Sequence, residues 1–387
     1  MIRTDKTEGK RILFVVNNPD FFLSHRRELG LGAKALGMDV HVATPATTGW
    51  KQILQEGFSF HKISMSRSRG LPWQEVSTLI ALVLLYQKLR PDIIHHVTIK
   101  PVIYGSLVAR LLPGSSVVNA VSGLGTVFIA EGTWNRLRRF AVKGIYRLAF
   151  ARARHRAIFQ NLDDLRAFAE AGILKNGDGV IIKGSGVDPE RFRMHPEPLG
   201  PPVVVLASRL LWDKGVGEFV AAASALKAKG VVARFILVGE TDAGNPTSVP
   251  KTSLEKWQEQ GVVEWWGHRK DIAEIFSQCH LVCLPSYREG LPKVLIEAAA
   301  SGRAIVSTDV PGCREIVIHQ KNGLLVPARS GLDLAAALET LILDTDLRKR
   351  MGAESRLLFE RGFSIKHVVD QTMDLYSNLL EASGPFD

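Results

Sequence analysis

Short apolar runs separated by longer amphipathic stretches recur along the whole chain. The runs lie at 12–16, 40–43, 92–97, 116–121, 157–160 and 180–183, and again at 203–207, 233–238, 262–266, 281–284, 304–307 and 323–326. Short β-branched runs with helix-length segments between them are typical of buried parallel strands in βαβ units. The pattern predicts an α/β protein with two Rossmann-like, doubly wound domains. Because open parallel sheets bind ligands at the carboxyl ends of their strands, we expect the domains to face each other across a cleft.

A cluster of helix and strand breakers predicts the boundary between these domains. Residues 194–202, MHPEPLGPP, hold four prolines and one glycine. We therefore expect an N-terminal domain over 1–195 and a C-terminal domain over 196–363. In the tail, 364–387, Val368, Met373 and Tyr376 have helical spacing. We expect that helix to cross back onto the first domain.

The composition fits a globular protein with an uneven charge. The 387 residues are 46% hydrophobic and 23% charged, which excludes a disordered chain. Residues 1–200 carry 28 Lys and Arg against 16 Asp and Glu, whereas residues 201–387 carry 21 against 23. The basic half predicts an anionic partner, which is a nucleic acid, a membrane surface or a phosphorylated substrate. Three cysteines, which cannot all pair, and a polar N-terminus favour a reducing cytoplasm.

One predicted helix, 134–156, combines two opposite stripes. Apolar side chains stand at Trp134, Leu137, Ala141, Ile145 and Leu148, and basic side chains at Arg136, Arg139, Lys143 and Arg147. The apolar stripe can cover a sheet and leave the basic stripe in solvent. The alternative is contact with an anionic membrane, to which the apolar segment 76–86 would contribute. No segment reaches the roughly 20 apolar residues that a membrane-spanning helix needs.

Two segments of the second half predict a site for a diphosphate. In LVCLPSYREGLPKVLIEAAASG, 281–302, a strand, a loop and a helix follow one another, and the helix start attracts anions. Glu289 lies before that helix, and Glu297 interrupts its apolar run, where a buried carboxylate needs a partner. After the strand at 203–207, Arg209 and Lys214 can converge on one diphosphate.

These segments resemble the donor domain of glycosyltransferase family 4, retaining enzymes with the GT-B fold. The resemblance rests on SRLLWDKG at 208–215, LVGE at 237–240, GHRKDI at 267–272 and the long segment 284–317. The spacing of Glu289 and Glu297 matches the E-x7-E marker of that family. In the first half, FFLSHR, HHVTIKPVIYGS and GLGTVF resemble a subgroup that acts on sugars linked to polyprenyl diphosphate.

The resemblance implies a role for each matching residue of the donor domain. Arg209 and Lys214 would bind the nucleotide diphosphate and stabilise the leaving phosphate. Glu297 would accept hydrogen bonds from the ribose, and Glu289 would contact the donor sugar. The remaining expected contacts are the backbone N–H groups of Gly290 and Leu291 at the phosphate, and Arg269 at the nucleobase. No Asp-x-Asp motif stands where a divalent cation would be needed, so we expect neither a metal nor a cofactor beyond the nucleotide-sugar substrate.

The acceptor is expected to bind the first domain. The loop after the first strand, NNPDFFLSHRREL, lacks the glycine pair that many relatives carry there, and His25 is its candidate acceptor residue. His95 and His96 end the strand at 92–97, and only one of them can point toward the cleft because strand residues alternate. His96 is the candidate of the two.

The resulting hypothesis is a retaining enzyme that moves a hexose or N-acetylhexosamine from a nucleotide-diphosphate sugar, with UDP as the expected nucleotide, to a sugar linked to polyprenyl diphosphate in bacterial glycan assembly. We expect it in the cytoplasm, on the inner leaflet of the membrane, with a nucleotide sugar, a lipid-linked acceptor and an anionic membrane surface as partners. The alternatives are a soluble family 4 transferase with a non-lipid acceptor and, less favoured, a basic nucleic-acid-binding protein. Aromatic residues do not interleave with the basic run, so no nucleic acid is expected as a partner.

Overall fold

In this computed structural model the described residues are 7–66, 71–121, 123, 133–152, 154–175, 177–242 and 244–381. Side chains at 133–139 and 141 are not described. Most of the GLGTVF loop therefore lies outside the described part of the chain, as do the side chains of the stripe residues Trp134, Arg136, Leu137, Arg139 and Ala141.

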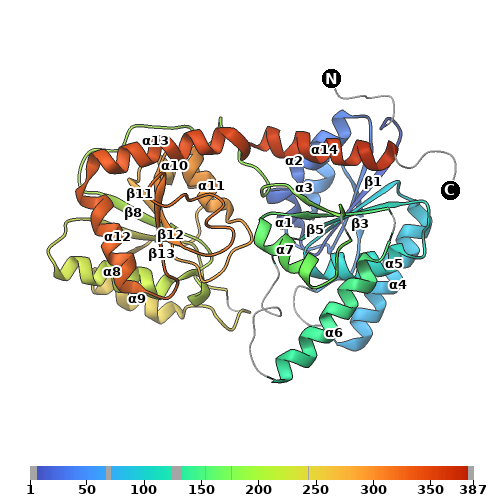
Figure 1. The fold of residues 1–387 in the computed structure, drawn as a ribbon, viewed down its shortest axis with the longest axis horizontal. Helices are drawn as coiled ribbons and strands as arrows, with labels where there is room; N and C mark the ends of the chain where they lie inside the picture. Colours follow the sequence, from blue (N-terminus) through green and yellow to red (C-terminus); the bar gives the residue numbers. More distant parts are fainter. Residues whose placement is uncertain are drawn as a thin grey trace. The chain divides into compact units, whose positions relative to one another are not determined.

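The first unit contains one parallel sheet in the order β3-β2-β1-β4-β5-β6-β7 among the residues described (Figure 1). Its strands are β1 Arg11–Val16, β2 Asp39–Thr44, β3 Ser59–Lys62, β4 Ile93–Val97, β5 Ser116–Val121, β6 His155–Phe159 and β7 Gly179–Ile181. Strands β1, β4 and β5 are buried along nearly their whole length, as the apolar runs predicted. Strand β3 was not predicted, because its sequence SFHK alternates at a sheet edge and forms no apolar run.

Helices cover both faces of this sheet. They are α1 Pro19–His25, α2 Arg27–Ala35, α3 Trp50–Gln55, α4 Pro72–Leu89, α5 Ser106–Ala109, α6 Thr133–Phe150, α7 Leu162–Glu170 and α14 Ile365–Glu381, with a π-helical turn η2 at Pro101–Gly105. Helices α1, α2 and α14 share one core with Phe14 of β1. On the other face, α4 and α5 pack on Leu13 and Ile94, and α6 packs on Ala157 and Phe159.

The strand register shows that α4, α5 and α6 cover the same face. It aligns Val15 with His96, His96 with Asn119, and Asn119 with Ala157. Side chains that are paired across parallel strands point to the same side of a sheet. The outer surfaces of α4, α5 and α6 therefore belong to one side of this unit.

The second unit repeats the doubly wound arrangement with the strand order β10-β9-β8-β11-β12-β13. Its strands are β8 Val203–Ala207, β9 Arg234–Val238, β10 Glu264–Trp265, β11 Leu281–Leu284, β12 Ala304–Thr308 and β13 Gly323–Val326. Its helices are η4 Trp212–Lys214, α8 Val216–Ala228, α9 Lys251–Glu259, α10 Ile272–Ser277, α11 Lys293–Ala300, α12 Gly331–Leu343 and α13 Thr345–Gly362. Helices α8 and α12 cover one face, and α10 and α11 cover the other.

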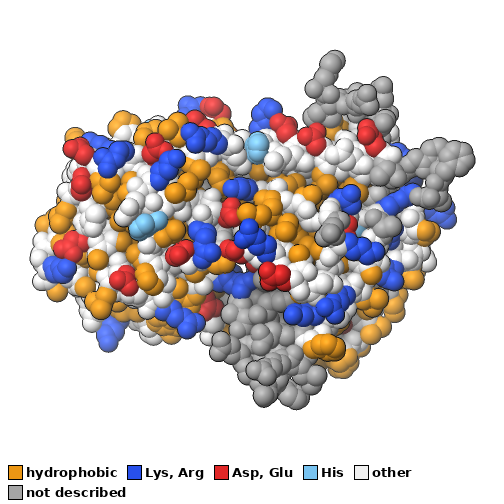
Figure 2. All heavy atoms as spheres, in the orientation of Figure 1, with side chains coloured by type: hydrophobic (Ala, Val, Ile, Leu, Met, Phe, Trp, Pro, Cys, Tyr) orange, Lys and Arg blue, Asp and Glu red, His pale blue; other side chains and the backbone are white. Residues whose placement is uncertain are grey.

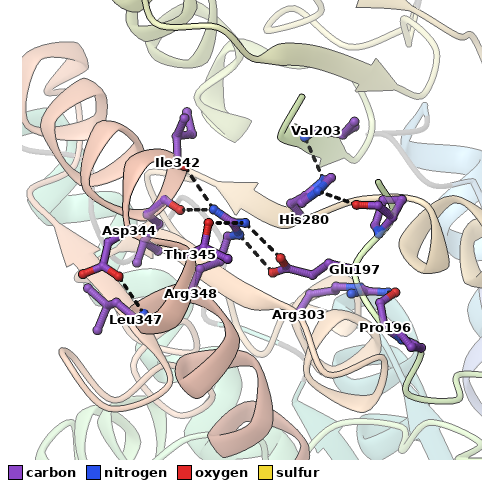
Figure 3. Close-up of polar contacts among 12 residues, drawn as sticks. Pro196, Glu197, Val203, His280, Arg303, Ile342, Asp344, Thr345, Leu347 and Arg348 are labelled. Atoms are coloured by element: carbon purple, nitrogen blue, oxygen red, sulfur yellow. Dashed lines mark hydrogen bonds and ion pairs between the residues drawn. The ribbon is translucent and has the colours of Figure 1, made fainter. Parts of the chain in front are cut away.

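The chain passes between the units earlier than the proline cluster suggested. One unit comprises Met1–Ser185 with Lys366–Asp387, and the other comprises Gly186–Ile365. Segment 194–202 is not a free linker, because its polar groups bind the second unit (Figure 3). The Glu197 carboxylate accepts two hydrogen bonds of 2.9 Å from Arg348 of α13. His280 lies 3.1 Å from the Pro198 carbonyl oxygen and accepts the N–H of Val203.

The end of the chain belongs to the first unit. Val368, Met373, Tyr376 and Leu379 of α14 are buried in the core that α1 and α2 form with the first sheet. The side chains of Tyr376 and His95 of β4 are joined by a hydrogen bond of 2.5 Å between the hydroxyl and Nδ1. Helix α14 therefore completes one face of a sheet whose first strand begins at residue 11.

Helix α6 does not turn the described part of its apolar stripe toward the sheet. Ile145 and Leu148 of that stripe are 43% and 52% exposed. Tyr146, Ala149 and Phe150 are buried instead, and the two aromatic rings pack edge-on or tilted against Phe168. Large aromatic side chains thus set the packing face, because they bury more surface than Ile145 and Leu148 would.

Candidate active site

The loops that follow β8 and β11 meet at the carboxyl edge of the second sheet. Lys214, the last residue of η4, places its ammonium group 2.5 Å from Oε1 of Glu289. The Ser286 hydroxyl donates a 2.7 Å hydrogen bond to the same oxygen. Both charged side chains are largely buried. A cation and an anion are therefore held together directly before helix α11.

Arg209 lies on the same loop as Lys214 and binds a different carboxylate. Its Nη1 is 3.0 Å from Oδ2 of Asp242, which follows β9, and the guanidinium is about half exposed. Arg209 and Lys214 thus bind different carboxylates in this conformation. Asp242 was missed by the sequence reasoning, although its position after a strand at the carboxyl edge was a usable signal.

Backbone contacts hold these loops against one another. Gly215 has φ +72°, and a Cβ there would overlap the carbonyl oxygen of Pro285. Gly312 has φ +73°, and its Cβ would lie 2.5 Å from the carbonyl oxygen of Gly290. Only glycine allows both the left-handed conformation and this close approach. The position of the Glu289 loop thus depends on glycines in two neighbouring loops.

Helix α11 carries the second glutamate of the marker. The helix starts at Lys293 after Pro292, and Gly302 follows it with φ +66°. Burial raises the pKa of the Glu297 carboxyl to about 7, although Lys293 and Arg191 oppose this shift. The Lys293 ammonium is 3.9 Å from Oε1 of Glu297. The carboxylate is therefore poorly solvated and suited to accepting hydrogen bonds from a ligand.

The other expected donor contacts lie around this edge in different environments. Arg269, exposed after β10, pairs with Asp271 and lies 5.9 Å from the centre of the Trp266 ring. Gly290 belongs to the loop before α11, and Leu291 beside it is buried.

A tyrosine of the same loop was not anticipated. Tyr287 donates a 2.7 Å hydrogen bond to Glu218 of α8, and Arg329, which follows β13, stacks over its ring. The pKa of Tyr287 is raised to about 12, mainly by burial and to a smaller extent by the Glu218 carboxylate. The tyrosine and its two partners come from three distant parts of the sequence, so no local signal could have grouped them.

The histidines of β4 are structural in this conformation. His95 and His96 point to opposite faces of the sheet, as alternation predicted, and both are fully buried. Nδ1 of His96 is 2.8 Å from Asn119 Oδ1, and its Nε2 is 2.8 Å from the Tyr86 hydroxyl. Burial lowers the pKa of His96 to about 4. Both ring nitrogens are occupied, so His96 does not meet the expectation of a direct acceptor contact here.

His25 is more accessible than the histidines of β4. It ends helix α1, stacks on Phe21 with ring centres 4.2 Å apart, and lies 2.7 Å from the Ser24 hydroxyl. Asn18 caps the start of this helix by accepting from the N–H groups of Asp20 and Phe21. The loop that carries FFLSHR is thus a short, capped helix at the carboxyl end of β1.

Within the described part of the chain, His, Cys, Asp and Glu side chains form no group of three or more that could hold a metal ion. The three cysteines lie in the core as free thiols. Among the same residues, no helix has both the length and the apolar character needed to span a bilayer.

Comparison with protein families and solved structures identifies the architecture. Residues 187–358 match the family described as Glycosyl transferases group 1, and residues 11–161 match the family described as Glycosyl transferase 4-like. The structure of HepE from Anabaena in complex with UDP is similar, with a TM-score of 0.75, 19% identity, and coverage of 95% of this chain and 100% of that chain. The fold is therefore that of the GT-B glycosyltransferases.

The similarity to characterised sequences extends along most of the chain. An N,N'-diacetylbacillosaminyl-diphospho-undecaprenol alpha-1,3-N-acetylgalactosaminyltransferase from Campylobacter jejuni is 29% identical over 359 residues, which are 89% of this chain and 92% of the relative. A capsular polysaccharide biosynthesis glycosyltransferase, CapM of Staphylococcus aureus, is 23% identical and covers 89% and 91%. The two halves of the chain therefore match two glycosyltransferase families, and the protein is a glycosyltransferase.

Proposed function

We propose that this enzyme transfers a hexose or N-acetylhexosamine from a UDP-linked donor to a sugar carried by polyprenyl diphosphate. The names of the Campylobacter and Staphylococcus relatives support an acceptor of this class and a role in bacterial glycan assembly. The observation that carries the proposal is the pair of Lys214 and Glu289 at the start of α11.

The donor site uses charges that the protein already holds together. An ammonium has three N–H donors, so Lys214 can keep Glu289 and still donate to a phosphate oxygen. The ion pair of Arg209 and Asp242 is exposed and contributes little free energy. Arg209 can therefore leave Asp242 and bind the diphosphate with only a small loss of free energy. The N–H groups of Gly290 and Leu291 face the same anion, as at other helix starts.

Three further residues define the rest of the donor site in this proposal. The Glu297 carboxylate accepts from the ribose hydroxyls, Glu289 accepts from the sugar, and Arg269 beside Trp266 contacts the base. Burial of both glutamates strengthens their hydrogen bonds, because water competes less for them.

The reaction retains the configuration of the sugar and needs no protein nucleophile. The acceptor oxygen bonds to the anomeric carbon on the face from which the diphosphate leaves. The bond between that carbon and the phosphate oxygen breaks, and this oxygen takes the acceptor proton. Lys214 and Arg209 stabilise the charge that develops on the diphosphate.

On the acceptor side, we propose that His25 contacts the acceptor and that His96 positions the loops around it through Asn119 and Tyr86. The excess of basic residues in the first half supports peripheral binding to an anionic membrane, on the cytoplasmic leaflet, where the lipid-linked acceptor resides.

Calorimetric titration with UDP tests the donor site. We expect Lys214→Met to weaken UDP binding roughly tenfold or more, because a charge-assisted hydrogen bond contributes about 1.5–3 kcal/mol. The matched control is Lys229→Met, whose ammonium pairs with Glu339 at 2.7 Å on the same unit. Equal UDP affinity in the two variants would contradict the site. Transfer to a soluble sugar as efficient as transfer to the lipid-linked one would favour the non-lipid alternative.

A further inference from the structure

Helix α4 exposes a continuous apolar ridge. Trp73, Val76, Ile80 and Leu84 are 65%, 54%, 55% and 61% exposed. Their steps of three, four and four residues place them on one side of the helix, over roughly 17 Å at the usual helical rise. The opposite side of α4, with Leu82 and Tyr86, is buried on the sheet. The helix is therefore apolar on both sides, and only one side is covered within this unit.

Neighbouring elements of the same layer also expose apolar side chains. On α6, Phe140 is 73% exposed, and Ile145 and Leu148 are exposed as well. Leu111, two residues after the end of α5, is 65% exposed. Because α4, α5 and α6 cover one face of the first sheet, these side chains and the ridge lie on the same side of the unit. Exposed apolar surface gathered in this way indicates an interaction site.

The charge of the segment that carries the ridge indicates what covers it. Between residues 67 and 156 the sequence has fourteen Lys and Arg against three Asp and Glu. The one acid of α4, Glu75, is neutralised by Lys100 at 2.6 Å. Figure 2 shows basic and hydrophobic side chains next to one another over the lower right of the molecule. An apolar ridge on a strongly basic segment complements the acyl region and the anionic headgroups of a bilayer.

A second copy of the chain fits this surface less well. In a symmetric dimer the same patch meets itself, so one basic segment would face another. Like charges brought together across an interface oppose association. A bilayer has no such conflict, because its surface carries the opposite charge.

We propose that the ridge of Trp73, Val76, Ile80 and Leu84 inserts into the headgroup and acyl boundary of an anionic membrane, with α4 parallel to its surface. This rests on the proposed function, which places the acceptor in that membrane. It goes beyond electrostatic adsorption, because inserted side chains hold the protein by burial of apolar area. Binding of this kind survives salt that screens the basic residues.

Sedimentation of the full-length protein with phosphatidylcholine vesicles, with and without phosphatidylglycerol, tests the insertion. We expect the wild type to pellet with anionic vesicles at about 0.1 M NaCl and to remain largely bound at about 0.5 M, where charges are screened. The ridge variant, Trp73→Ser with Ile80→Ser and Leu84→Ser, should lose roughly tenfold or more in partition at the higher salt.

A matched control separates insertion from general loss of apolar surface. Val232, Leu332 and Leu343 of the second unit are 72%, 82% and 68% exposed, and their triple serine variant should pellet like the wild type. Complete release of the wild type at the higher salt, or wild-type pelleting of the ridge variant, would overturn the insertion. So would a dimer in size-exclusion chromatography that only the ridge variant loses.

The outcome is independent of the donor site. Thermal stabilisation by UDP, measured on the same two variants, should equal that of the wild type, because neither variant touches the residues of the donor proposal. If UDP failed to stabilise the wild type, the proposed function would be contradicted, but the vesicle result would still stand.

Discussion

Glu297 illustrates how the surroundings of one side chain set its chemistry. Burial raises the pKa of its carboxyl from 4.5 to about 7, while the nearby cations Lys293 and Arg191 limit the rise. The folded protein favours the protonated carboxyl of Glu297. The contribution of this group to the free energy of unfolding is therefore fully present below pH 4.5 and is lost as the pH rises through about 7. Ligand binding should follow the opposite trend, because only the carboxylate accepts hydrogen bonds through both oxygens.

We therefore expect UDP binding to weaken by about fivefold between pH 8 and pH 6, since a charged acceptor is worth about 1 kcal/mol more than a neutral one. Glu297→Gln should bind weakly at both pH values and show a flat profile. Titration calorimetry at several pH values measures this, with Glu339→Gln on α12 as the control. An unchanged pH profile in Glu297→Gln would show that another group titrates.

At the scale of elements, the loops of the donor site are held by backbone contacts that only glycine permits. Gly215 ends η4 and begins α8, and its left-handed conformation brings the Lys214 loop against Pro285 of the β11 loop. Gly230, after α8, has nearly the same φ of +76° but has no heavy atom near its virtual Cβ. The two glycines thus differ in the atoms that surround them, whereas an alanine at either position would have the same unfavourable φ.

Alanine substitution separates these two effects. Gly230→Ala should reduce the free energy of unfolding by about 1 kcal/mol, the cost of the left-handed conformation. Gly215→Ala should cost at least about 3 kcal/mol, because overlap with the Pro285 carbonyl adds to that strain. It should also weaken UDP binding, since the pair of Lys214 and Glu289 is displaced. Urea denaturation and calorimetry measure the two quantities, and equal losses of stability in both variants would exclude a packing role.

At the scale of the whole molecule, the two ends of the chain build one unit. Tyr376 of α14 is completely buried beside β1 and β4, and its hydroxyl binds His95. The first unit therefore cannot complete its core until nearly the whole chain has been synthesised. The second unit, Gly186–Ile365, is formed by one continuous segment.

Tyr376→Ala should consequently destabilise the first unit alone. Removal of a buried aromatic ring costs about 3–5 kcal/mol, which lowers the unfolding temperature by roughly 10 °C. Tyr376→Phe removes only the hydroxyl and should cost about 1 kcal/mol. Scanning calorimetry with and without UDP measures both, and the stabilisation by UDP should persist in each variant. A loss of UDP binding in Tyr376→Ala would contradict the independence of the two units.

The sequence predicted those features that depend on neighbouring residues. All six strands of the second sheet coincide with apolar runs, and α11 lies within the segment where a helix was expected to follow a strand and a loop. The polar edge strand β3 had no such signal. The packing face of α6 was left open by the sequence, because it depends on the contacts of Tyr146 and Phe150 with Phe168, which no helical stripe reveals.

Sequence by itself determined the family, the two doubly wound sheets and the residues placed at the carboxyl edge of the second one, because strand periodicity and motif spacing are local properties. Only the tertiary structure decided which partners those residues have. It joined Lys214 to Glu289, held Arg209 at Asp242, buried His96 between Asn119 and Tyr86, and fixed the proline cluster through Arg348. These contacts connect residues far apart in the chain, so their geometry exists only after the sheets have packed.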